Sequence, residues 1–116
     1  LLGRVDDAFA VMKKSDIFWH LSITEGMPLA IIEAMALGLP IVGFDVEGVR
    51  DVVLHNQNGY LVEYGDINGI VEKTSHLIDS DDTRKVMAKK SQKLYNSKYT
   101  KKLMLQGYRA SLENLL

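Results

Sequence analysis

Residues 17–44 read IFWHLSITEGMPLAIIEAMALGLPIVGF, a stretch in which two apolar runs flank a loop and a longer apolar segment. The runs at 17–21 and 40–44 have the length and composition of buried strands. Between them, residues 28–37 predict a helix, because a proline stands in the first turn and a glycine follows the end. Two strands joined through a helix predict a parallel pair, the unit from which α/β sheets are built.

The same alternation continues on both sides of this stretch. Strands that are apolar throughout, together with short connections, indicate a parallel α/β sheet with helices on both faces. Only three or four strands are visible, and the chain begins LLGRV without a methionine, so we expect part of the sheet to lie upstream of Leu1. The further elements predicted are strands at 1–3 and 60–64 and helices at 5–16, 47–53, 66–78, 81–95 and 100–116.

Composition limits the class of protein. With 116 residues, 47% of them apolar and 25% charged, the chain is one globular domain or a piece of one. A net charge of −1 argues against a general affinity for nucleic acid, and the lack of cysteine excludes disulfides and cysteine-ligated metals. His20, His55 and His76 are too scattered to predict a metal site. The lack of cysteine fits the cytoplasm; no apolar run approaches the ~20 residues of a membrane span, and no signal peptide is visible.

Glu33 is the single charged residue in the apolar helix predicted at 28–37. Because this helix is apolar on all sides, we expect it to be buried, and an unpaired carboxylate there would cost several kcal/mol. Glu33 should therefore have a partner, which is either a donor in the protein or a ligand. Taken alone, it could be a structural carboxylate bonded to backbone N–H groups.

A second carboxylate, Glu25, stands eight residues earlier, in the loop that leads into the helix. Gly26 lets a ligand approach the backbone closely, and Pro28 presets the first turn. The free N–H groups at the helix start favour an anion, and open α/β sheets bind ligands at the carboxyl ends of their strands. Taken singly, Glu25 would be a solvated residue stabilised by the helix dipole. Together, the two carboxylates predict a shared ligand with paired hydroxyls, such as a sugar or a ribose.

Several motifs occur in an order and spacing that resemble one enzyme family. SITEGMPLAIIEAMALGLPIVGFDVEGVRDVV, residues 22–53, is similar to the E-x7-E region of retaining, nucleotide-sugar-dependent GT-B glycosyltransferases of family 4 (glycosyl transferases group 1). LLGRVDD resembles the family's opening G-x-V, SDIFWHLS the strand before the signature, and NGYLV the N-G-x-L-V that precedes the next helix. The resemblance covers nearly the whole chain. It implies the C-terminal, Rossmann-like donor-binding domain of a two-domain enzyme, here incomplete at its N-terminal side.

The resemblance also implies roles for individual residues. Glu33 would accept hydroxyls of the nucleotide ribose. Glu25 would contact the donor sugar, and the resemblance assigns it no proven catalytic step. Six further residues would surround the same donor: Gly26, Met27 and Pro28 at the sugar, Leu29 at the ribose and diphosphate, and Arg4 and Val5 at the base.

The implied activity is transfer of a sugar, typically a hexose, from a nucleotide-diphosphate sugar to an acceptor hydroxyl with retention at the anomeric carbon. Such enzymes usually proceed by same-face substitution, need no metal or other cofactor, and serve polysaccharide or glycolipid biosynthesis. The acceptor sugar or glycolipid would bind an N-terminal domain that this sequence lacks, and the basic residues that neutralise the diphosphate would lie upstream of Leu1. We therefore expect the 116-residue chain alone to be inactive or nearly so.

Two departures and two alternatives accompany the resemblance. Leu21 stands where proline is frequent, and Glu47-Gly48 stands where Gly-Gly is common, which would alter contacts near the donor. A GT-B-like nucleotide-sugar epimerase would share the sheet and the ribose contact, but the loop at 25–28 is typical of the transferases. A non-catalytic nucleotide-binding module is the other alternative.

Basic residues gather near the C-terminus, where eight of the fourteen lie between Arg84 and Lys102. A solvated helical face is the ordinary interpretation, and a peripheral contact with anionic lipid at the inner face of the membrane is the alternative. The helix predicted at 100–116 carries an apolar stripe from Leu103 to Leu115. This stripe would suit packing on the N-terminal domain or dimerisation.

Overall fold

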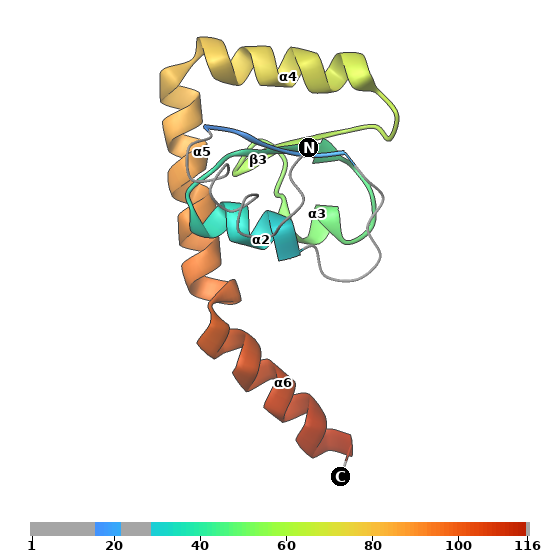
Figure 1. Cartoon of the computed structure of the whole chain (residues 1–116), viewed down its shortest axis with the longest axis vertical. Helices are drawn as coiled ribbons and strands as arrows, with labels where there is room; N and C mark the ends of the chain where they lie inside the picture. The colour runs from blue at the N-terminus through green and yellow to red at the C-terminus, as the bar shows by residue number, and fades with distance from the viewer. Residues whose placement is uncertain (1–15, 22–28, 116) are drawn as a thin grey trace, which may run out of the picture.

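Strands and helices alternate along the chain as the sequence predicts (Figure 1). The structure is a computed structural model of the chain, and it describes residues 16–21 and 29–115. The predicted strand at 1–3 and almost all of the predicted helix at 5–16 lie outside these residues. The described elements, in order, are β1 (Phe18–His20), α2 (Leu29–Ala36), β2 (Ile41–Phe44), α3 (Val49–Val52), β3 (Gly59–Val62), α4 (Ile67–Asp79), α5 (Asp81–Leu94), the π-helix η1 (Tyr95–Tyr99) and α6 (Lys101–Leu115).

Three strands form a parallel sheet in the order β1-β2-β3. Phe18 of β1 pairs with Ile41 of β2, and Gly43 of β2 pairs with Leu61 of β3. The chain passes from β1 to β2 through α2, which is the crossover that a parallel pair requires. All four residues of β2 are buried, as expected of a central strand covered on both faces. The prediction of a parallel, Rossmann-like α/β sheet is confirmed.

Helices cover both faces of this sheet, with α4 on one side and α2 and α3 on the other (Figure 1). On the α2 side, Met35 and Val49 pack in one core with Ile41. On the α4 side, Leu77 packs in a second core with Val42. Ile41 and Val42 are neighbours in β2 and enter opposite cores, because successive side chains of a strand point to opposite faces.

Two glycines and an asparagine fix the connections around β2. Gly38 follows α2 with a φ of 73°, and its N–H donates to the Met35 carbonyl at 3.0 Å, a left-handed helix end as predicted. At Gly59 a Cβ would lie 1.9 Å from the Ile41 carbonyl oxygen, so the close approach of β3 to β2 requires glycine. The buried Asn58 side chain accepts a hydrogen bond from the Leu54 N–H at 2.7 Å. The Asn-Gly pair is therefore a structural element of the fold.

The C-terminal third forms a helical arm. Ser91 of α5 is buried and donates to the Leu39 carbonyl at 2.8 Å, which ties α5 to the turn before β2. After η1, α6 runs away from the sheet (Figure 1), and none of its described side chains is buried. The molecule is consequently elongated, with extents of 51 × 31 × 26 Å. Within residues 16–21 and 29–115, no helix has both the length and the apolar character needed to cross a membrane.

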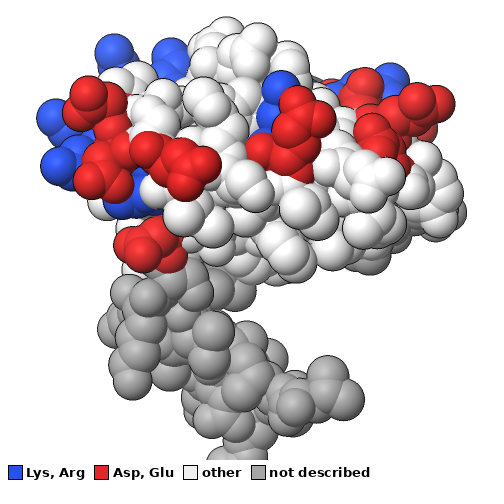
Figure 2. Space-filling model, turned by 90° about the horizontal axis from the view of Figure 1, so that it is seen from above, with Lys and Arg blue, Asp and Glu red and all other residues white. Residues whose placement is uncertain are grey.

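Charge is divided unevenly between the sheet and the arm. Residues 1–80 contain five basic and twelve acidic residues, whereas residues 81–116 contain nine basic and three acidic ones. Figure 2, which looks down on α4, shows acidic side chains in several groups across that face. The overall charge of −1 therefore conceals two regions of opposite sign.

Candidate functional site

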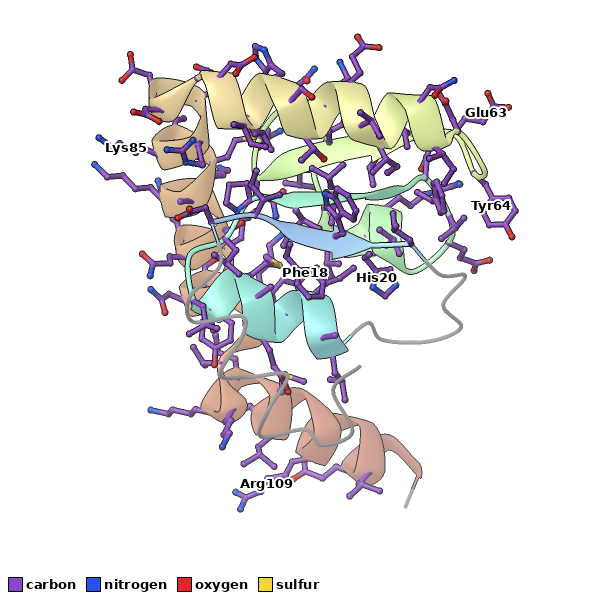
Figure 3. All side chains as sticks on the ribbon, turned by 45° about the horizontal axis from the view of Figure 1, so that its top comes forward. Phe18, His20, Glu63, Tyr64, Lys85 and Arg109 are labelled. Atoms are coloured by element: carbon purple, nitrogen blue, oxygen red, sulfur yellow. The ribbon has the colours of Figure 1, made fainter. Side chains whose placement is uncertain are left out.

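The start of α2 lies at the carboxyl edge of the sheet. Because β1 and β2 are parallel and α2 connects them, α2 must begin near the end of β1 and run back antiparallel to the strands. Leu29 is its first residue, and His20 is the last residue of β1. Figure 3 shows His20 on the α2 side of β1, the same side as Phe18. This edge is where the sequence places the predicted ligand.

The prediction that Glu33 is buried is wrong. The Glu33 side chain is exposed, and Leu29 on the same outer face of α2 is 56% exposed. One face of α2 packs on the sheet, and the apolar residues of the opposite face lie at the surface, so an all-apolar helix need not be enclosed. The residues of α2 that do pack inward are Ile31, Ile32, Ala34 and Met35.

The solvated position of Glu33 changes what its carboxylate needs. It has no hydrogen-bond or ion-pair partner among the residues that the structure describes. A carboxylate in water loses no solvation and therefore requires no donor from the protein. Of the two partners expected from the sequence, the protein donor is not observed within the described part of the chain. The carboxylate oxygens remain accessible to a ligand.

Glu33 lines a cavity of about 430 Å³ between α2 and the C-terminal helices. Leu29 of α2 and Leu37, which directly follows α2, lie in one wall, and Tyr99 of η1 and Met104 of α6 lie in the opposite wall. Lys101 also lines it, and among the described residues it is the second charged group of a largely apolar hollow. Apolar walls with a few charged groups are the usual composition of a small-molecule site. That C-terminal residues face Glu33 was not predicted from the sequence.

Tyr99 is held firmly in this wall. It packs against the core formed by α2, α3 and β2, and it is half-buried. Burial raises the pKa of its hydroxyl, and the negative charge of Asp51 raises it further. The phenol is therefore neutral at physiological pH and can donate one hydrogen bond toward the cavity. The pair Tyr95 and Tyr99, spaced by four, was the sequence signal that could have identified this wall.

A charged turn follows β2 at the same carboxyl edge. Asp45 comes directly after β2, and its carboxylate pairs with the Arg50 guanidinium at 3.1 Å. Arg50 also donates to the Asp45 carbonyl at 3.2 Å. Between them, Gly48 has a φ of 89°, so the Glu47-Gly48 pair forms a turn that needs glycine at its second position. This turn, where the sequence departs from Gly-Gly, thus has a defined structure.

Most predicted donor contacts lie outside the described residues. These are Arg4, Val5, Glu25, Gly26, Met27 and Pro28. The structure therefore brings together two of the predicted site residues, Leu29 and Glu33, on the outer face of α2. Within the described chain, no group of three or more His, Cys, Asp or Glu side chains is arranged to hold a metal ion.

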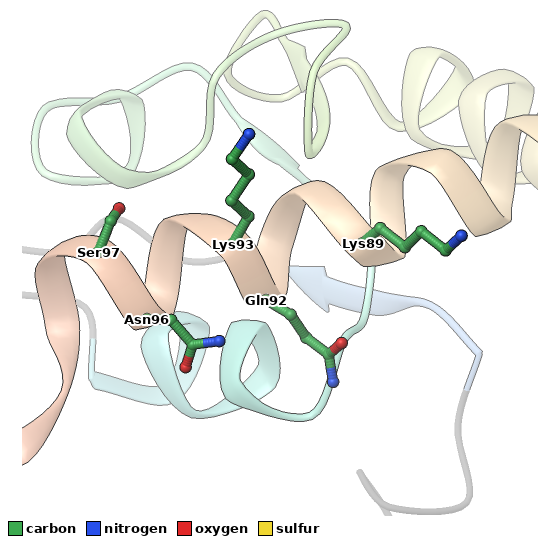
Figure 4. Close-up of a pocket in the computed structure, with 5 residues that line it drawn as sticks. All are labelled: Lys89, Gln92, Lys93, Asn96 and Ser97. Atoms are coloured by element: carbon green, nitrogen blue, oxygen red, sulfur yellow. The ribbon is translucent and has the colours of Figure 1, made fainter.

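A second hollow, of about 550 Å³, lies beside α5 and η1. Its lining side chains point in different directions: Lys93 and Ser97 to one side of the helix, and Gln92 and Asn96 to the other (Figure 4). A small-molecule site needs polar groups that converge on one ligand. We therefore place the candidate site at the cavity beside Glu33 and regard the second hollow as part of a basic surface.

Comparison with known proteins places the chain in one family. The profile described as "Glycosyl transferases group 1" matches residues 1–94. The UDP-Gal:alpha-D-GlcNAc-diphosphoundecaprenol alpha-1,3-galactosyltransferase of Escherichia coli is 36% identical over 89 residues, which are 77% of this chain and 23% of that enzyme. The chain spans about a quarter of the length of the curated relatives it matches.

Two solved structures with the same fold extend this comparison. A variant of TarM from S. aureus, in complex with fondaparinux, alpha-GlcNAc-glycerol and UDP, superposes with a TM-score of 0.79 at 28% identity and covers 88% of this chain and 21% of that one. The C-terminal domain of the group 1 glycosyltransferase LpcC from Francisella tularensis has a TM-score of 0.77 at 25% identity and covers 87% of this chain and 52% of that one. The profile match over most of its length shows that the chain belongs to the glycosyl transferases group 1 family, whose solved relatives share its Rossmann-like sheet.

Proposed function

We propose that the chain is part of the donor-binding domain of a retaining glycosyltransferase that uses a nucleotide-diphosphate sugar. The observation that carries this proposal is the exposed Glu33 at the cavity beside α2, spaced from Glu25 as in the family's E-x7-E signature. An exposed carboxylate on a helix that begins at the carboxyl edge of a parallel sheet can accept paired hydroxyls. The relatives support a nucleotide sugar, because the E. coli enzyme is named for UDP-Gal and the TarM complex contains UDP.

The proposed roles follow the donor along the carboxyl edge. Glu33 accepts the ribose hydroxyls, and Glu25 accepts hydroxyls of the sugar to be transferred. The remaining donor contacts are Gly26, Met27 and Pro28 at the sugar, Leu29 at the ribose and diphosphate, and Arg4 and Val5 at the base. In the reaction, the bond from the anomeric carbon to the phosphate oxygen breaks, and a bond to the acceptor oxygen forms on the same face of the sugar. The acceptor's proton passes to the leaving diphosphate, so no carboxylate of this chain is required as a nucleophile.

The transferred sugar is proposed to be a hexose, and the acceptor a sugar or glycolipid. The printed names of the relatives support this class, since the E. coli enzyme transfers galactose to a GlcNAc carried on diphosphoundecaprenol. We propose that the acceptor binds a separate N-terminal domain, on which α6 packs through its exposed leucines Leu103, Leu105 and Leu112. Residues 1–116 would then bind the donor side and transfer little sugar on their own, which a transfer assay of the isolated chain tests.

Titration of UDP, GDP and ADP against the full-length protein tests the donor proposal. We expect one of the three to bind, and Glu33→Ala to weaken it at least tenfold, because hydrogen bonds to a charged group contribute about 1.5–3 kcal/mol each. Since the Glu33 side chain is exposed, its removal opens no cavity and should leave the protein folded.

Glu72→Ala is the matched control, because Glu72 is also an exposed glutamate in a helix, but in α4 on the far side of the sheet. It should bind the same diphosphate as tightly as the unmodified protein. Undiminished binding by Glu33→Ala, or no binding of any of the three diphosphates by the unmodified protein, would reject the ribose assignment.

We also propose a peripheral membrane contact through the basic arm. Between Arg84 and Arg109 there are nine basic residues and no acidic one. Among the described ion pairs only Arg84 of these nine takes part, with Asp81. Each basic residue near an anionic bilayer contributes about 1 kcal/mol of attraction. Lys85, Lys89 and Lys93 are all exposed on α5 at spacings of four, which places them on one stripe of the helix.

Vesicle sedimentation tests this contact. The full-length protein should bind vesicles that contain phosphatidylglycerol and not vesicles of phosphatidylcholine alone, and added salt should release it. Replacement of Lys85, Lys89 and Lys93 by glutamine should weaken binding at least tenfold, whereas replacement by arginine should preserve it. Equal binding of the glutamine and arginine variants would reject this surface.

A further inference from the structure

Lys101 and Glu33 line the same cavity from distant parts of the chain. Glu33 belongs to α2, which packs against η1, and Lys101 is the first residue of α6, directly after η1. Both side chains are exposed, and these two described residues have opposite charges without forming an ion pair or a hydrogen bond with each other. The cavity of about 430 Å³ therefore presents a carboxylate and an ammonium group that are both accessible to a ligand.

The backbone around Lys101 is fixed by the start of α6. The Thr100 hydroxyl accepts a hydrogen bond from the Leu103 N–H at 3.2 Å, and the Thr100 carbonyl accepts one from the Met104 N–H at 2.9 Å. Thr100 therefore caps the helix, and the preceding Tyr99 packs against the core on the α2 side. Because its neighbours are anchored in this way, the Lys101 backbone is held beside the cavity while its four-carbon stem can rotate.

Local helix energetics do not explain a lysine at this position. The first turn of a helix is the positive end of its dipole, where a basic side chain is unfavourable and an acidic one is favourable. Nevertheless α6 begins with Lys101 and Lys102 and has no acidic residue in its first turn. Of these two lysines, Lys101 alone lines the cavity. A ligand group that accepts a hydrogen bond would offset the unfavourable interaction at Lys101.

The charged groups of the cavity have complementary hydrogen-bonding chemistry. An ionised carboxylate only accepts hydrogen bonds and an ammonium group only donates them, whereas a hydroxyl does both. A hydroxyl between the two can therefore donate to Glu33 and accept from Lys101. The apolar side chains of Leu29, Leu37 and Met104 line the same cavity and can contact the carbon atoms of the ligand. This combination fits a hydroxylated ring better than a phosphate, which the Glu33 carboxylate would repel.

We propose that Lys101 is a specificity residue for the ribose of the nucleotide, with its ammonium group donating a hydrogen bond to the 2′-hydroxyl while that hydroxyl donates to Glu33. This inference rests on the function proposed above, which assigns the ribose to Glu33. It makes the C-terminal arm part of the donor site, because α2 and α6 then hold the ribose from opposite sides. Lys101 selects a ribonucleotide over a deoxyribonucleotide and takes no part in bond formation.

The test compares a ribonucleotide with its 2′-deoxy counterpart. In the full-length protein, we measure the dissociation constants of the preferred diphosphate among UDP, GDP and ADP, and of the same diphosphate without the 2′-hydroxyl. The unmodified protein should bind the deoxy form about tenfold more weakly. Lys101→Met keeps the length of the side chain and removes its charge, so it should weaken ribonucleotide binding about tenfold and deoxy binding by less than about threefold. Lys101→Arg retains a charged donor and should stay within about threefold of the unmodified protein for both ligands.

Lys102→Met is the matched control, because Lys102 is the next residue of α6, is also exposed and does not line the cavity, and it should alter neither constant. Ribonucleotide binding by Lys101→Met within about twofold of the unmodified protein would overturn the inference, and a loss of binding in Glu33→Ala would at the same time leave the proposed function intact. Equal weakening of both forms would also overturn it, because that pattern indicates a general effect of charge. Equal binding of the two forms by the unmodified protein would do the same. Failure of the unmodified protein to bind any of the diphosphates would reject the proposed function and this inference together.

Discussion

The sheet and the arm of this chain are built on different principles. Residues 1–80 are acidic and hold nearly all of the buried core, whereas residues 81–116 are basic and contribute mainly the inner face of α5. Strand order, helix placement and the Asn58-Gly59 connection are fixed by buried contacts, but α6 has no buried side chain among those described. From this difference we infer that the buried contacts of the sheet region stabilise the fold, whereas the arm exposes charged and apolar surface that partners could bind.

Glycine replacement gives the largest expected contrast between the two regions. Gly59→Ala would place a Cβ 1.9 Å from the Ile41 carbonyl oxygen, so β3 must separate from β2, and we expect a loss above about 4 kcal/mol in the free energy of unfolding. In the arm, a Cβ at Gly107 meets nothing within 4 Å, and Gly107→Ala should stabilise α6 by up to about 1 kcal/mol. Urea denaturation of the two variants measures both changes. Equal effects would show that the sheet region is no more tightly packed than the arm.

Leucine truncation is expected to give a smaller contrast of the same kind. Leu77 is fully buried between α4 and the sheet, and Leu77→Ala should lower the free energy of unfolding by about 3 kcal/mol through lost burial and a new cavity. Leu105 in α6 is 63% exposed, and Leu105→Ala should change it by less than about 0.5 kcal/mol. A large loss on Leu105→Ala in the full-length protein, against none in residues 1–116, would identify α6 as an interdomain contact.

Ser91 joins the arm to the sheet region by a buried hydrogen bond. Its buried hydroxyl donates to the Leu39 carbonyl at 2.8 Å, so Ser91→Ala would leave that carbonyl without this donor, and we expect a loss of about 1–2 kcal/mol. Ser97→Ala is the control, because the Ser97 hydroxyl bonds locally to the Leu94 carbonyl and its side chain is exposed. Thermal unfolding followed by circular dichroism compares the two variants. If Ser97→Ala lowered the unfolding temperature as much as Ser91→Ala, hydrogen bonds within the helix would contribute as much to stability as the bond from Ser91 to Leu39.

Local signals in the sequence predicted the elements well. Asp66 accepts a hydrogen bond from the Gly69 N–H at 2.9 Å and begins α4, and Gly38 ends α2 with positive φ, both as expected from capping chemistry. Apolar runs predicted the strands because a covered parallel sheet buries both faces of each strand. These features depend on residues within a few positions of one another, so the sequence alone is sufficient to identify them.

Features that depend on distant partners were not predictable in the same way. The apolar residues of α4 do not all face the core, since Ile67, Val71 and Ile78 are exposed whereas Ile70 and Leu77 are buried. Glu33 was wrongly expected to be buried, since composition does not reveal which face of an apolar helix meets the sheet. The spacing of Tyr95 and Tyr99 indicates two rings on one side of a helix, but their position opposite Glu33 depends on the path of the chain through η1, which the spacing does not reveal. The roles of Glu25 and its loop remain predictions.

The smallest expected contrast is in how the free energy of unfolding depends on pH, and it compares two residues of β1, His20 and Phe18. Burial lowers the pKa of His20 below its ordinary value of 6.5, so as the pH falls through 6.5 the unfolded chain takes up a proton that the folded chain resists. The free energy of unfolding should therefore be independent of His20 at higher pH and decrease below 6.5, until the folded imidazole is protonated as well. His20→Gln should remove this part of the decrease.

Phe18→Leu is the control, because Phe18 lies on the same face of β1. It should lower the free energy of unfolding equally at all pH values and keep its slope against pH. An unchanged slope in His20→Gln, measured by urea denaturation from pH 7.5 to 5.5, would mean that protons reach His20 as readily in the folded protein as in the unfolded chain.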